Sequence, residues 1–204
     1  MPILQTAAAS VVAFAATDVD DIVVLAVLFS RRDAGLTFGR ILGGQLAGIG
    51  VLLAASTAVA AGLVGLPDGA AGALGPIPIG LGGTGAGRPR RGGPSGGAQG
   101  ARAASAPVAS VWAVALITIA NGGDNVAVYV PFLANLDLSE VGLVVAPVFA
   151  AMTVVWVLVA ALVGTRPAFV ALVDRAGRYA VPIVLIALGA WILADSGLAG
   201  DLLP

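Results

Sequence analysis

The 204-residue sequence has no cysteine, no histidine and no lysine, and only 10% of its residues are charged. Without cysteine and histidine, it lacks disulfides, thiolate metal sites, cysteine nucleophiles and histidine bases. A soluble domain carries about a quarter charged residues, because these cover its surface. With 59% hydrophobic residues and 29 glycines, the composition instead indicates a polytopic membrane protein.

Apolar runs bounded by charge, glycine or proline predict six membrane-spanning helices. A span needs about 20 mostly apolar residues. Four runs are long enough, whereas the third and sixth are short and each contains a proline. The predicted spans are 3–29, 36–66, 69–81, 108–133, 141–163 and 179–193.

All ten cationic residues are arginines, and all of them fall in the three odd-numbered loops between these spans. Loops rich in arginine face the cytoplasm, so both termini are predicted to lie outside. The arginines are Arg31, Arg32, Arg40, Arg88, Arg90, Arg91, Arg102, Arg166, Arg175 and Arg178.

Residues 82–107 are rich in glycine, proline, serine and arginine and have almost nothing to bury. They predict a flexible cytoplasmic linker between two three-helix units, 1–81 and 108–204. The glycines of this segment follow no strand and lead directly into no helix, so we expect neither a nucleotide site nor a cofactor.

The two units share landmarks at a constant offset of 104 residues, at which Asp20 pairs with Asp124 and Pro78 with Pro182. Because each unit has three spans, the second enters the membrane from the opposite face. The predicted fold is therefore an all-α membrane protein of two inverted three-helix repeats. Secondary transporters with this architecture bind substrate near the midplane, where the repeats meet.

Four acids, Asp18, Asp20, Asp21 and Asp124, lie inside the first and fourth spans, which contain no arginine. A charge at the centre of a spanning helix costs about 2.5–3.5 kcal/mol. Interhelical hydrogen bonds supply only about 0.6 kcal/mol each, so structural bonding alone does not account for four carboxyl groups. These acids must face protein or water, carry a proton, or bind a cation.

In both spans, polar residues at positions i, i+3 and i+4 share one helical face. Two such faces meeting at a pseudo-two-fold axis would offer carboxylate, amide and hydroxyl oxygens to a divalent cation. Gly122 and Gly123 would allow close backbone approach or opening of the helix. Asp18 lies off the face, and its role is open. The candidate metal ligands are Asp20 and Asp124, with Asp21, Asn125, Thr17 and Asn121 as further oxygens.

Five segments resemble the cadmium resistance transporter (CadD-like) family, which is grouped with the LysE-type exporter superfamily. The resemblance implies a multi-pass protein of the bacterial plasma (inner) membrane that exports a divalent metal, with Cd2+ as substrate. The segments are ATDVDD at 16–21, NGGDN at 121–125, GPIPIGLG at 75–82, and RYAVPI at 178–183 with LGAWILADSG at 188–197.

The predicted function is metal export coupled to proton antiport, because carboxyl groups release protons when metal binds. We expect no enzyme activity and no nucleic-acid partner; the expected partners are the metal ion, protons and membrane lipid, and a homo-oligomer is left open. Cadmium favours thiolate ligands, so Mn2+ or another oxygen-preferring cation is an alternative substrate. The wider superfamily implies an amino-acid exporter as a second alternative. A remote alternative is an intramembrane aspartyl protease, whose two carboxyl groups would be Asp20 and Asp124.

Overall fold

The computed structural model describes residues 3–30, 36–63 and 110–163, with single positions beyond. The third predicted span, the linker and, apart from single positions, the sixth span lie outside the described residues. Every described element is a helix: α1 (Ile3–Thr17), α2 (Asp21–Ser30), α3 (Phe38–Leu63), α6 (Val111–Asn121), α7 (Gly123–Leu133), α8 (Leu138–Glu140), the π-helix η3 (Val141–Val145) and α9 (Ala146–Val163).

Two of the described helices, Phe38–Gly62 and Leu138–Leu162, are long and apolar enough to cross a membrane. A third candidate span is the pair Val111–Asn121 and Asn125–Leu133, whose two parts are bent by 77°. These three correspond to the predicted second, fifth and fourth spans. The apolar helices therefore support the prediction of a membrane protein.

The first predicted span is broken in its middle, where residues 18–20 separate α1 from α2. The amide of Asp21 donates to the carbonyl of Asp18 at 3.2 Å and that of Val23 to Asp20 at 3.0 Å. These three-residue hydrogen bonds tighten the chain into a turn. Asp and Thr side chains compete with the helical backbone for hydrogen bonds, which explains why the helix stops at this acidic run.

The fourth predicted span is broken at Gly122, between α6 and α7. The Gly122 amide caps α6 by donating to the carbonyls of Thr118 at 2.9 Å and Ile119 at 3.2 Å. A Cβ atom at Gly122 would overlap the side chain of Leu52 in α3. The expected helix opening is thus confirmed at Gly122, whereas its close neighbour is a side chain and not a second backbone.

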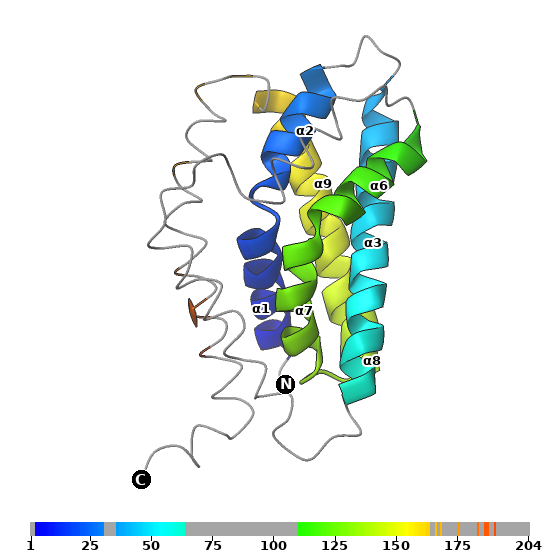
Figure 1. The fold of residues 1–204 in the computed structure, drawn as a ribbon. Coiled ribbons are helices and arrows are strands. Elements are labelled where there is room, and N and C mark those ends of the chain that lie inside the picture. Colours follow the sequence, from blue (N-terminus) through cyan, green and yellow to red (C-terminus); the bar gives the residue numbers. More distant parts are fainter. Residues whose placement is uncertain are drawn as a thin grey trace.

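The two broken helices lie in the same bundle and run in opposite directions. In Figure 1, α1 leads upward into α2, whereas α6 leads downward into α7, and both breaks fall near mid-height. The long helices α3 and α9 run past both breaks. The polar residues at the two breaks are therefore held in the middle of the bundle.

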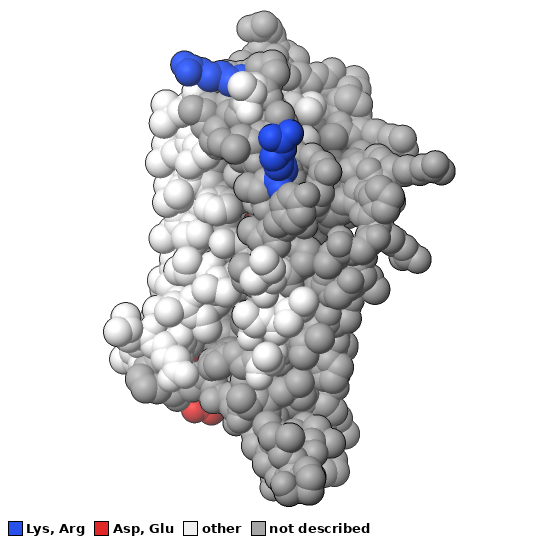
Figure 2. Space-filling view, turned by 90° about the vertical axis from the view of Figure 1, so that its left-hand side faces the viewer, with Lys and Arg blue, Asp and Glu red and all other residues white. Residues whose placement is uncertain are grey.

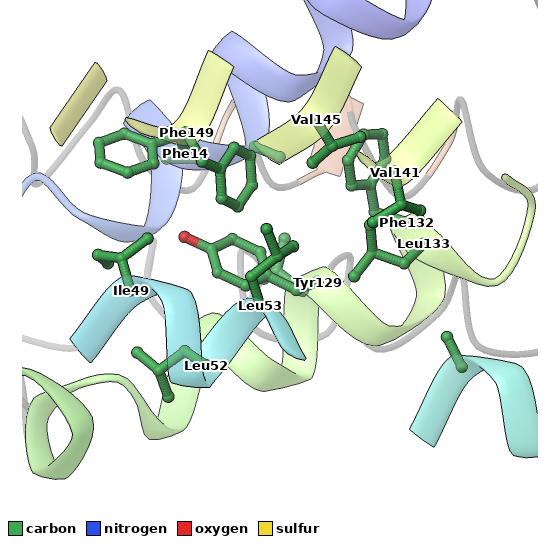
Figure 3. Packing of buried hydrophobic residues seen from close by; sticks show 14 residues of the cluster. Phe14, Ile49, Leu52, Leu53, Tyr129, Phe132, Leu133, Val141, Val145 and Phe149 are labelled. Carbon is green, nitrogen blue, oxygen red and sulfur yellow. The ribbon is translucent and has the colours of Figure 1, made fainter. Parts of the chain in front are cut away.

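Two apolar clusters lie on either side of the breaks. The α1–α7 cluster is built around Phe14, Tyr129, Phe132 and Phe149. The Tyr129 ring lies centrally in Figure 3, between the phenylalanines on one side and the leucines of α3 on the other. The α2–α6 cluster consists of Val24, Leu25, Leu28, Phe29, Leu36, Ile41, Val114, Ile117, Val157 and Ala160.

The described charged side chains on the surface gather at opposite ends of the molecule. In Figure 2, the blue arginine side chains lie in the upper part of the view and red acidic atoms lie near its lower end. Arg40 is at the start of α3, whereas Asp137 and Glu140 are at α8, near the opposite end of α3 in Figure 1. Arg40 and these two acids therefore lie toward opposite ends of α3.

Helices α3 and α6 approach closely because α3 carries glycines four residues apart. A Cβ at Gly44 would lie 2.6 Å from the Val111 carbonyl oxygen, and one at Gly48 would lie 2.5 Å from the Thr118 Cβ. Small residues at this spacing let helix backbones pack closely in membranes. The close packing brings Gln45, which lies between the two glycines, to the polar centre of the bundle.

We expect Gly48→Ala to lower the free energy of unfolding by about 1–3 kcal/mol, because the added methyl group overlaps α6. Thermal unfolding in detergent would measure the change. The control is Gly50→Ala on the same helix, where a Cβ meets nothing within 4 Å and helix propensity favours alanine by about 1 kcal/mol. Equal stability changes in the two variants would contradict the close-packing account.

Candidate cation site

Asp18, in the turn between α1 and α2, is 1% exposed. Its Oδ1 accepts a hydrogen bond from Asn125 Nδ2 at 2.9 Å. Its Oδ2 accepts from the Tyr129 hydroxyl at 2.7 Å and lies 3.0 Å from the Thr17 hydroxyl. Trp156 Nε1 donates to its main-chain carbonyl at 2.7 Å. Both oxygens of this buried carboxyl are therefore satisfied, and by neutral donors.

Asp21, the first residue of α2, has a second buried carboxyl that lies between two primary amides. Gln45 Nε2 donates to its Oδ2 at 2.6 Å, and Asn121 Nδ2 donates to its Oδ1. The Gln45 Oε1 in turn accepts from the Thr118 hydroxyl at 2.6 Å. Asp21 thus connects α2 with both α3 and α6.

Asn121 has one buried atom whose hydrogen-bonding capacity is unused. The residue is 4% exposed, and its Oδ1 has no hydrogen-bond partner among the described residues. The other end of the same amide bonds Asp21. A buried acceptor without a partner costs about 1–3 kcal/mol. The amide of Asn121 therefore satisfies Asp21 through its nitrogen and leaves its own oxygen unpaired.

The two networks join the two helix breaks to each other. Asp18 and Asp21, on either side of the first break, bond respectively to Asn125 and Asn121, on either side of the second. Each break therefore fixes the position of the other. Carboxylate, amide and hydroxyl oxygens meet at this junction, and these are the ligand types that hard divalent cations take.

The charge of the Asp18 carboxylate is not balanced by a cationic side chain within the described part of the chain. The described arginines, Arg40, Arg166 and Arg175, are all exposed, and the hydrogen bonds to Asp18 come from neutral groups. A buried carboxylate without a countercharge is costly. A proton or a bound cation would remove that cost.

The structure brings Thr17, Asp21, Asn121 and Asn125 into these networks, which are four of the six predicted ligands. Asp20 lies half-buried in the turn of the first break. The side chain of Asp124 lies outside the described residues. Within the described residues, no group of three or more acidic side chains is placed to hold a metal ion, so the ligand roles stay predictions.

The expectation that Thr17, Asp20 and Asp21 share one continuous helical face is wrong. The helix ends at Thr17 and a new one begins at Asp21, so the spacing of a single helix does not apply. The break instead makes Asp18, which that spacing placed off the face, the most buried of the described acids.

Four residues of the site were not predicted from the sequence: Gln45, Thr118, Tyr129 and Trp156. Gln45 could have been found, because a polar side chain lies there inside an apolar span between two glycines at membrane-packing spacing. Tyr129 and Trp156 carried no such signal, since both also serve as apolar core residues.

Tyr129→Phe removes one hydroxyl donor from Asp18 and keeps the ring. Hydrogen bonds to charged groups contribute about 1.5–3 kcal/mol, so we expect this loss of stability in thermal unfolding at a pH where Asp18 is ionised. The control, Thr153→Val, removes a buried hydroxyl that bonds only the Phe149 carbonyl of its own helix. Equal losses in both variants would contradict a special role for the Asp18 network.

Broken helices whose ends meet around buried polar groups are typical of secondary transporters, so the fold and the site together define a helical membrane protein of transporter type. The model of the cadmium resistance transporter family matches residues 14–203, nearly the whole chain. The chain therefore belongs to the cadmium resistance transporter family. No curated protein and no solved structure matches it significantly.

Proposed function

We propose that this protein exports a divalent metal cation, with Cd2+ as its substrate, in exchange for protons. The observation that carries the proposal is the junction of the two helix breaks, where Asp21 and Asn121 bond each other inside the bundle. Family membership supports cadmium as the cargo. The transported ion would be held by oxygen ligands from both breaks, with Asp20 and Asp124 completing the set.

The proposal includes a six-span fold of two inverted repeats. Its support is the opposite direction of the two broken helices (Figure 1) and the separation of described charges along the molecule (Figure 2). In such a fold, the two halves rock about a central site, which opens to one side of the membrane at a time. Here the α1–α7 and α2–α6 clusters would close the central site toward opposite sides of the membrane.

Proton exchange follows from the chemistry of the site. A cation entering a buried site displaces protons from the carboxyl groups that bind it, and the protons return when it leaves. Either occupant compensates the cost of a buried carboxylate. The protein would therefore change from one open side to the other only with a metal ion or protons bound. That condition couples the flow of metal to the flow of protons.

We expect Asp21→Asn to lower Cd2+ flux into proteoliposomes by about 10- to 100-fold, since changes at a metal site have effects of this size. A metal-sensitive dye inside the liposomes measures Cd2+ or Mn2+, and a pH-sensitive dye measures the proton counterflow. Asp124→Asn is expected to behave in the same way.

The matched control for these variants is Asp137→Asn. Asp137 is exposed and caps α8, a role that asparagine fills equally well. Wild-type flux in the Asp137 variant with loss in the Asp21 variant supports the site. Undiminished flux in both the Asp21 and Asp124 variants would remove it, and amino-acid uptake without metal flux would favour the amino-acid exporter.

We expect both termini to face outward. Alkaline phosphatase fused to either end is then active, and green fluorescent protein fused to the same ends is dark. Fluorescence at both ends would reverse the proposed orientation while leaving the metal site untouched.

A further inference from the structure

Gln45 in α3 occupies a position that the proposed transport mechanism does not yet use. Its side chain is 4% exposed and bridges the carboxyl group of Asp21 and the hydroxyl of Thr118. It comes from a long helix that passes both breaks (Figure 1). A residue so placed can tie the broken helices to an unbroken one.

The amide of Gln45 can present either end to Asp21. Its nitrogen donates to Asp21, and a half turn would present the oxygen instead. After that turn the nitrogen would face Thr118, whose hydroxyl also lies 3.1 Å from the Val114 carbonyl and can donate there. The Gln45–Thr118 pair therefore keeps its hydrogen bonds in both orientations.

Asn121 provides the independent observation that a cation belongs at this point. Its buried Oδ1 has no hydrogen-bond partner among the described residues, while its nitrogen bonds Asp21. A half turn of this amide would offer the unused oxygen to an ion on the carboxylate. After both turns, the amide oxygens of Gln45 and Asn121 would be two neutral ligands beside the charged carboxylate of Asp21.

We propose that Gln45 is a ligand of the transported cation and sets its preference among divalent metals, an inference that rests on the proposed function. One carboxylate and two amide oxygens, from α2, α3 and α6, form a hard-ligand set on three helices. Such a set favours oxygen-preferring ions such as Mn2+ relative to a site containing sulfur. A neutral oxygen from Gln45 would therefore lower the preference of the site for soft metals.

The test replaces Gln45 by two residues of similar length and opposite ligand character. Gln45→Glu adds a hard charged oxygen, and Gln45→Met adds a soft thioether. Titration calorimetry on the full chain in detergent, with Cd2+ or Mn2+ alone, gives the ratio of the two dissociation constants. We expect the glutamate variant to move this ratio toward Mn2+ and the methionine variant toward Cd2+, each by about tenfold.

The control is Leu28→Met, which conserves side-chain volume. Leu28 is buried in α2, two turns or about 10 Å along its axis from Asp21. Its methionine should leave the Cd2+ to Mn2+ ratio at the wild-type value. A shift of equal size in this variant would show that the thioether acts without touching the ion, and it would overturn the proposal.

Unchanged ratios in both Gln45 variants, with wild-type binding intact, would show that Gln45 only supports the fold. If one variant fails to fold, the ratio measured in the other decides. A wild-type protein that binds neither metal would refute the proposed transport function itself, which is a different result from a Gln45 that binds no ion.

Discussion

The structure depends on burying two carboxyl groups where two broken helices meet. Asp18 and Asp21 lie on either side of one break and are held by asparagines on either side of the other. Neither could be buried inside a continuous apolar helix without a large cost in free energy. The breaks supply the space, and the polar partners keep the carboxyl groups in place.

The rest of the described bundle serves this junction. The glycines of α3 let it approach α6 so closely that Gln45 reaches Asp21. An apolar cluster lies on each side of the junction, and Trp156 packs against both. The ring nitrogen of Trp156 bonds the carbonyl of Asp18 at the first break. The polar centre is thus held by hydrogen bonds from several helices and covered by apolar side chains.

Much of the site could be predicted because charge inside an apolar span is a strong signal. The run at 16–21 and its counterpart at 121–125 identified Thr17, Asp21, Asn121 and Asn125, which the structure places in two linked networks. The prediction was wrong about the local backbone geometry at the first break. Helical spacing assumed an unbroken helix, so Asp18 was set aside although it is the most buried described acid.

The sequence by itself determined the membrane character, the acidic centre and the family, because these follow from composition, charge placement and motifs along the chain. Only the tertiary structure decided which acid bonds which amide and that α3 contributes Gln45. Those facts depend on where the helices break and on which helices touch. Contacts between residues 24 or 100 positions apart, as for Asp21 with Gln45 and Asn121, are set by packing in three dimensions, and spacing along one helix does not encode them.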